Sequence, residues 1–206
     1  MWTQLTWSHL RLLFNLETDS INYYINVIVN QNISVRELEN KIKFKEYERL
    51  DKSTKLKLIN DDESTIIDFV KNPILIKNSH NYEEVSEKVL QKLILEDISS
   101  FMKELGSNFS FIDSEYKIKI GDRYNYIDLL LFNIEFNCYV IVELKVTELK
   151  KEHIGQIQIY MNYIDNNLKK VNQDKTIGII ICKKDNKYVI EYASDDRIIS
   201  RTYEFM

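Results

Sequence analysis

Two neighbouring apolar runs constrain the fold of this chain most. Residues 124–132 and 138–146 are each about as long as a strand, and five residues separate them. A helical pattern at about 151–168 and a nearly continuous apolar run at 176–182 follow. A helix placed between strands in this way predicts an α/β fold in which helices flank a mixed sheet.

The rest of the back half is expected to extend the same fold. Asn72-Pro73 marks a boundary, because the residue before a proline is disfavoured in a helix. A helix is predicted over about 83–105, with Gly106 as its C-cap. Further strands are predicted at 109–112, 116–120 and 187–192. We therefore expect residues 74–206 to form one α/β domain.

The front of the chain has a helical pattern instead. Apolar residues predict helices from about Thr6 or Ser8 and over 19–31. Ser34 and Glu37 form an S-x-x-E capping box that opens a third helix. Residues 50–75 are polar and poorly periodic, and we expect an exposed loop at 61–64. Residues 1–70 are therefore predicted to be a small helical domain, similar to a helix-turn-helix bundle.

Composition limits the classes of function. The formal net charge of −4 argues against a protein whose entire surface binds nucleic acid. The segment 36–57 holds eight basic and five acidic residues, and could either contact phosphates or form a solvated, ion-paired face.

Compartment is inferred from two other features. The sequence contains no apolar segment of about 18 residues, so we expect no span of a membrane, and we find no signal-peptide pattern. Cys138 and Cys182 lie in apolar runs, and we expect two buried, reduced thiols. These features favour a cytoplasmic protein.

Three charged residues interrupt the two central apolar runs. Asp128 lies in the first run, and Glu143 and Lys145 lie in the second, 15 and 17 residues later. An unpaired carboxylate that is buried in a protein core costs several kcal/mol or becomes protonated. Such residues need a partner, unless the second run is an edge strand that carries a surface Glu-Lys pair.

Strand geometry indicates what that partner is. Side chains alternate along a strand, so Glu143 and Lys145 point to one face. A turn near 135–137 would pair the runs as a hairpin and bring Asp128 opposite Glu143. Two converging carboxylates repel each other unless a cation lies between them, and Mg²⁺ or Mn²⁺ prefers such oxygen ligands. The Leu144 carbonyl is a further candidate ligand, and Lys145 could orient a bound water.

The pattern D…E-x-K on adjacent strands is the PD-(D/E)xK nuclease signature, and the sequence resembles the YhcG-like family of that superfamily. The resemblance extends over nearly all of the chain after about residue 72 and is carried by six matching segments. Those segments are FMKELG at 101–106, YIDLL at 126–130, VELK at 142–145, GQIQIY at 155–160, IGIIIC at 177–182 and EYA at 191–193. In front, LTWSH at 5–9, SVREL at 34–38 and YERL at 47–50 resemble the end of the family's winged-helix-like domain. The family usually has more chain before this part, so we expect an incomplete DNA-binding module.

The resemblance implies an activity and a fuller site. It implies a restriction-endonuclease-like core that hydrolyses DNA with Mg²⁺ or Mn²⁺, with Asp128 and Glu143 as metal ligands and Lys145 as the catalytic lysine. It also places a Gln-x-x-x-Tyr pair on the following helix, here Gln156 and Tyr160. Four residues apart, these two share one helix face. Without the resemblance, Tyr160 would be read as a core aromatic and Gln156 as solvated.

One position departs from the family pattern. Many of these nucleases carry a glutamate on the first helix of the core, where this chain has Gln91, with Glu87 one turn earlier. The site could therefore lack one carboxylate. The alternative function is a weak or inactive nuclease fold that binds nucleic acid or assembles with protein. A homo-oligomer is compatible with either function, and His153 could either contact a phosphate or lie solvated at a helix start.

Overall fold

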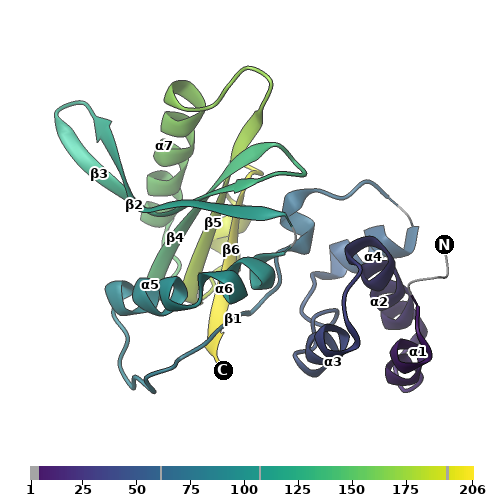
Figure 1. Cartoon of the computed structure of the whole chain (residues 1–206). Helices are drawn as coiled ribbons and strands as arrows, with labels where there is room; N and C mark the ends of the chain where they lie inside the picture. Colours follow the sequence, from purple (N-terminus) through teal and green to yellow (C-terminus); the bar gives the residue numbers. More distant parts are fainter. Residues whose placement is uncertain (1–4, 61, 107, 194) are drawn as a thin grey trace. The chain divides into compact units, whose positions relative to one another are not determined.

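The computed structural model describes residues 5–60, 62–106, 108–193 and 195–206, which form two compact units (Figure 1). The division falls between Ser64 and Thr65, ahead of the boundary that the sequence suggests near Asn72. The intervening residues belong to the second unit because Ile66 and Val70 are part of its core.

The described part of the first unit contains four helices, α1 (Trp7–Leu13), α2 (Thr18–Gln31), α3 (Val35–Lys43) and α4 (Lys52–Asn60). Thr6 caps α1 by accepting a hydrogen bond from the His9 amide, and Ser34 caps α3 in the predicted capping box. The three predicted helices are confirmed. Helix α4 lies in a segment where no helix was predicted, and the weak amphipathic pattern of its sequence explains why it was missed. The core of the unit is Leu13, Tyr24, Ile28 and Leu38.

A six-stranded mixed sheet forms the centre of the second unit (Figure 1). Its order is β1-β6-β5-β4-β3-β2, with β1, β6, β5 and β4 parallel and β3 and β2 antiparallel to their neighbours. The bounds are β1 (Ile74–Ile76), β2 (Phe109–Ile120), β3 (Arg123–Asn133), β4 (Cys138–Glu148), β5 (Asp174–Lys184) and β6 (Ile198–Phe205). The predicted α/β class with a mixed sheet is confirmed.

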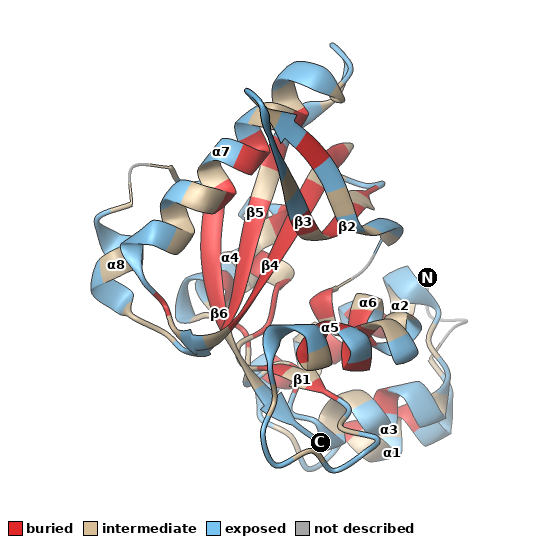
Figure 2. Ribbon diagram, turned by 90° about the vertical axis from the view of Figure 1, so that its left-hand side faces the viewer, coloured by how far each residue is buried: buried red, intermediate tan, exposed pale blue. Residues whose placement is uncertain are grey.

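Helices cover both faces of this sheet. On one face, α5 (Glu87–Glu96) and α6 (Ile98–Leu105) pack against Leu129, Val142 and Ile181. On the other, α7 (Lys151–Asn167) packs against Leu130, Ile141 and Ile180. The central strands are therefore buried on both sides, as Figure 2 shows. Such burial makes charged side chains within them costly.

Several predicted elements differ from the observed ones. The helix predicted over 83–105 is two helices, because Asp97 leaves helical geometry and caps α6 through the Ser100 amide. The strands predicted at 109–112 and 116–120 are one strand, β2, with a register shift between Phe111 and Asp113. Residues 187–192 were expected to be a strand, and instead hold the short helix α8 (Lys187–Glu191).

Strands β1 and β6, and the 3₁₀ helix η1 (Ile66–Phe69), were not predicted. The charge of Arg201 obscured β6 in the sequence; the guanidinium is buried and donates to the Val70 carbonyl oxygen at 2.8 Å. Cys138 and Cys182 are both buried and free, as expected. Among the described residues, no helix has the length and apolar character needed to cross a membrane.

Candidate active site

The predicted site begins where β3 and β4 separate. Their pairing runs from Asn133 opposite Cys138 to Leu129 opposite Val142. The next residues in this register are Asp128 and Glu143, where the backbone pairing of the two strands has ended. Beyond this point the Asp128 carboxylate, and not a backbone carbonyl of β3, accepts the hydrogen bond from β4. Its Oδ2 accepts a hydrogen bond from the Leu144 amide at 2.8 Å. The N–H and C=O of a strand residue project to the same side, so the Leu144 carbonyl also faces β3.

Glu143 is buried on β4, with 2% of its surface exposed. Its Oε2 accepts a hydrogen bond from the Lys145 Nζ at 3.3 Å, whereas its Oε1 is buried without a hydrogen-bond partner in the described structure. Burial, and then the charge of Asp128, raise the pKa of Glu143 to about 8. Burial also raises the pKa of Asp128, although the Leu144 amide and Lys145 oppose this shift. Both shifts mark a place where negative charge is poorly compensated.

Lys145 lies between two acidic side chains. Its Nζ is 3.3 Å from Glu143 Oε2 and 3.8 Å from the Oε2 of Glu87, at the start of α5. Burial acts to lower the pKa of Lys145, but the charges of Glu143, Glu87 and Asp128 outweigh it and raise the pKa. Lys145 is therefore a charged ammonium at neutral pH, suited to donate hydrogen bonds and unsuited to accept a proton.

Gln91 supports the site from α5. Its Nε2 donates to the backbone oxygen of Asp128 at 2.9 Å, and its side chain is buried. The side chain fixes the position of Asp128 and carries no charge. Within the described part of the chain, no three His, Cys, Asp or Glu side chains are grouped to hold a metal ion. The site therefore presents two converging carboxylates, with Glu87 beyond Lys145.

The pair predicted on the helix lies on α7. The Gln156 Nε2 donates to the Tyr160 hydroxyl at 3.1 Å. Tyr160 is buried, and burial raises its pKa, with a further contribution from the charge of Glu143. Burial is the main cause that lowers the pKa of His153, and the charge of Lys145 is the second. The His153 Nδ1 accepts a hydrogen bond from the Lys150 amide at 3.2 Å. The first turns of α7 thus lie within electrostatic reach of Glu143 and Lys145.

The donor set fits a hard divalent cation. The available donors are carboxylate and carbonyl oxygens, which Mg²⁺ and Mn²⁺ prefer. The unsatisfied Glu143 Oε1 and the raised pKa of the pair show that the protein alone does not balance this charge. Asp128, Glu143 and the Leu144 carbonyl are therefore suitable ligands.

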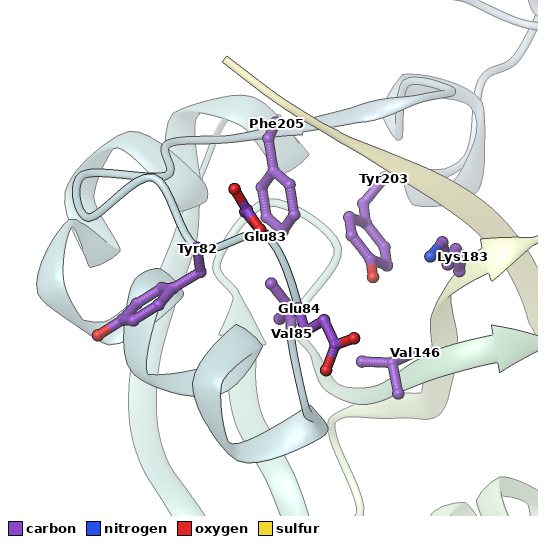
Figure 3. A pocket seen from close by; sticks show the side chains of 8 residues that line it. All are labelled: Tyr82, Glu83, Glu84, Val85, Val146, Lys183, Tyr203 and Phe205. Atoms are coloured by element: carbon purple, nitrogen blue, oxygen red, sulfur yellow. The ribbon is translucent and has the colours of Figure 1, made fainter.

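A cavity of about 640 Å³ opens near the site but does not include it (Figure 3). Val146 in its wall follows Lys145, and alternation along β4 directs the two side chains to opposite faces. The carboxylates of Glu83 and Glu84 face this cavity, together with Lys183 and aromatic rings.

The structure shows contacts that follow from the predicted hairpin and one that was not predicted. In the observed hairpin of β3 and β4, Asp128 contacts the Leu144 amide and the Lys145 Nζ contacts Glu143. The contact between Glu87 and Lys145 was not predicted, although a glutamate one turn before Gln91 was a visible signal.

Comparison with known proteins agrees with this architecture. Residues 67–204, which include β1 to β5 and all of β6 except its last residue, match the family described as the YhcG PDDEXK nuclease domain. The chain belongs to this family. It carries a PD-(D/E)xK nuclease domain, with Asp128 and the Glu143-x-Lys145 segment at the positions described above.

The individual relatives described next are each less than 30% identical to this chain. The protein named "Putative nuclease YhcG" of Escherichia coli strain K12 is 28% identical over 192 residues, which is 90% of this chain and 51% of that protein. The chain thus spans about half the length of this curated relative. A repair endonuclease from Pyrococcus abyssi gives a TM-score of 0.41 at 18% identity, over 62% of this chain and 49% of that one. A complex of EndoMS with double-stranded DNA gives 0.40 at 18% identity, over 62% and 48%.

Proposed function

We propose that this chain is a metal-dependent DNA endonuclease that hydrolyses phosphodiester bonds at Asp128, Glu143 and Lys145. The observation that carries the proposal is the state of Glu143. Its carboxylate is buried beside Asp128, one oxygen has no hydrogen-bond partner in the described structure, and its pKa is raised to about 8. A fold gains nothing from this repulsion unless a cation relieves it.

The cation would be Mg²⁺ or Mn²⁺, and the carboxylates of Asp128 and Glu143 and the Leu144 carbonyl would hold it. When bound, it supplies Lewis-acid polarisation of the phosphate and lowers the pKa of water. The Leu144 amide holds Asp128 at 2.8 Å, and Gln91 holds the Asp128 backbone at 2.9 Å. These two hydrogen bonds orient the Asp128 carboxylate before the substrate arrives.

Lys145 and α7 act on the substrate. The Lys145 ammonium donates to the attacking water and to a non-bridging phosphate oxygen, where negative charge grows in the transition state. Gln156, held by Tyr160, orients Lys145 or contacts the phosphate. Water adds its oxygen to phosphorus and loses a proton to solvent. The bond from phosphorus to the 3′ oxygen breaks, the 3′ oxygen takes a proton from solvent, and the products end in 5′-phosphate and 3′-hydroxyl.

Cleavage assays test the proposal directly. We expect the purified chain to cut supercoiled, linear duplex or single-stranded circular DNA with Mg²⁺ or Mn²⁺, and not with EDTA. Lys145→Ala should lower the rate at least a hundredfold, since its charge acts in the transition state. Lys88→Ala changes an exposed lysine on α5 and serves as the matched control. If no DNA form is cut, or if both lysine variants cut equally well, the proposal is wrong.

A second candidate function rests on Gln91. A neutral amide at this position leaves the site with fewer charges than the family pattern, which favours a nuclease fold that binds nucleic acid or protein without cutting. Metal titration separates the two functions. A melting temperature that rises in millimolar Mg²⁺ or Mn²⁺ supports the nuclease, and an unchanged one supports the binding module.

The setting of this activity is part of the same proposal. DNA is the partner, and the helical first unit would contribute to its binding. The two buried, free thiols are in keeping with a reducing cytoplasm. A homo-oligomer is compatible with this proposal.

A further inference from the structure

The hairpin of β2 and β3 extends beyond the rest of the sheet. Pairing between β3 and β4 ends at Leu129 and Val142, whereas pairing between β2 and β3 continues to Ile120 opposite Arg123. The residues from 115 to 128 thus form a two-stranded arm, which projects to the left in Figure 1. The arm begins at Asp128, at the candidate active site.

The two faces of this arm differ in character. Ile118 and Ile127 are fully buried on one face, where they belong to the core that includes α7. The other face carries Lys117 opposite Tyr126 and Lys119 opposite Tyr124, and all four side chains are exposed. Burial on one side anchors the arm to the domain, so the four exposed side chains stand on a fixed support.

The exposed face leads into the catalytic residues. Tyr124 and Tyr126 flank the buried side of the arm that carries Ile127 and lie on its exposed face, and Asp128 directly follows Ile127 on β3. Glu115 is exposed at the end of this face nearest Asp128, and its charge contributes to the raised pKa of Asp128. Because Tyr124 and Tyr126 precede Asp128 on the same strand, a strand of substrate that reaches Asp128 along β3 would pass the two tyrosines.

The lysines and tyrosines are already organised without a ligand. The Lys117 Nζ lies 3.9 Å from the centroid of the Tyr124 ring, and the Lys119 Nζ lies 6.0 Å from it. A cation over an aromatic face is favourable and limits the motion of both groups. Tyr124 and Tyr126 nevertheless keep 56% and 52% of their surface exposed. Exposed aromatic rings next to ordered cations offer contacts to both the bases and the phosphates of a nucleic acid.

We propose that this face, formed by Lys117, Lys119, Tyr124 and Tyr126, binds the single-stranded segment of DNA that leads to the scissile phosphate. Lysines beside aromatic rings bind phosphates and stack unpaired bases, which is how single strands are held without sequence preference. Bases in a duplex are stacked on one another, so the tyrosine rings could not reach their faces. The inference rests on the proposed nuclease function and specifies its substrate as DNA with an unpaired stretch.

Binding measurements without metal test this inference separately from catalysis. The full chain in EDTA is titrated against fluorescent oligo(dT) of about 12 nucleotides, a length within the usual site size, and against a duplex of equal length. We expect tighter binding of the single strand. Tyr124→Ala and Tyr126→Ala should each weaken it about tenfold, the loss of one stacked base. Lys119→Ala should lower the slope of log K against the logarithm of the salt concentration by about one, the loss of one phosphate contact.

Two other tyrosines provide matched controls: Tyr188 lies within α8, and Tyr192 directly follows it. They are 74% and 81% exposed in the same unit, so alanine there removes a surface tyrosine with little effect on the fold. We expect these two variants to bind oligo(dT) like the unchanged protein. Binding that is unaffected by Tyr126→Ala, an equal loss in Tyr188→Ala, or a preference for the duplex would overturn the inference.

Failure of the proposed function gives a different result. Lys145→Ala should still bind oligo(dT) more tightly than the duplex in EDTA, while it cuts DNA at least a hundredfold more slowly in Mn²⁺. If the unchanged protein cuts no DNA while the hairpin variants lose binding, the nuclease proposal fails and the hairpin remains a binding face. If it cuts DNA while the hairpin variants bind normally, only the hairpin inference is overturned.

Discussion

Glu143 is held in a state that depends on pH and on metal. Its pKa is about 8 in the folded chain, against an ordinary value of 4.5. The folded state therefore retains a proton that the unfolded state releases. Without metal, the free energy of unfolding should fall as pH rises from about 4.5 through about 8, by an amount on the order of a few kcal/mol.

The variant Glu143→Gln isolates this effect, because the amide has the same shape and does not titrate. We expect it to be more stable than the unchanged protein at pH 8 in EDTA, with the difference vanishing near pH 4.5. Urea unfolding of both proteins across this range measures the difference. A difference that does not change with pH would contradict the assigned origin of the pKa shift.

Gln91 is the residue at which the family pattern and the local structure disagree. The pattern suggests that Gln91→Glu would complete the acidic cluster. The structure predicts that it destabilises the metal-free protein by about 1–3 kcal/mol, because a carboxylate cannot donate to the Asp128 oxygen that Gln91 holds. Thermal melting in EDTA measures this loss.

Gln91→Leu is the control for that experiment, since it removes the hydrogen bond without adding charge. We expect both variants to melt at lower temperature in EDTA, and only Gln91→Glu to recover with Mg²⁺ or Mn²⁺. Equal recovery in both variants, or no loss in either, would show that the hydrogen bond does not have the assigned role.

At the scale of elements, α7 and β5 are in close contact at a glycine. A Cβ built on Gly178 would lie 2.6 Å from the Met161 sulfur and 2.9 Å from the Ile157 Cδ1, closer than real contacts allow. Gly178→Ala should therefore destabilise the domain by about 1–3 kcal/mol. It should also displace α7, which carries Gln156.

Gly155 on α7 is the matched control, because a Cβ there meets nothing within 4 Å. Gly155→Ala should stabilise the helix by about 0.5–1 kcal/mol, since alanine loses less entropy in a helix. The two substitutions thus have opposite expected signs in chemical denaturation. Equal effects would contradict the packing of α7 on β5.

Some of the candidate site could be predicted because its signals are local. Asp128, Glu143 and Lys145 stand out as charges within apolar strands, and the alternation of side chains places them on a common face. The hydrogen bond from Gln91 spans 37 positions to Asp128, and depends on how α5 packs. Local patterns do not contain that information.

Element types show the same limit. Residues 187–191 include valine, isoleucine and tyrosine, which favour strands, yet they form α8 in the folded chain. Strand β6 was missed because Ser200 and Arg201 interrupt its apolar pattern. Their partners, the Asp185 carboxylate and the Val70 carbonyl, are remote in sequence. Tertiary contacts decide these elements.

On the scale of the whole molecule, the hydrophobic cores divide with the chain. The core of α1 to α3 draws only on residues before Ser64, whereas both cores of the sheet draw only on residues after it. A unit with its own core can fold without the other.

Packing sets the position of the boundary between the units. Asn72-Pro73 looks like a break in the sequence. The Asn72 side chain, however, accepts a hydrogen bond from the Thr202 amide at 2.9 Å and joins β6 to the segment before β1.

Residues 65–206 should therefore fold alone. We expect this fragment to unfold cooperatively, with the same metal-induced rise in melting temperature as the full chain, because every proposed ligand lies within it. A fragment that begins at residue 74 is the informative comparison. It lacks Ile66, Val70 and the carbonyl that Arg201 binds, so it should melt at a lower temperature or fail to fold. Circular dichroism of the three proteins measures this, and equal stability of the two fragments would move the boundary back to Asn72.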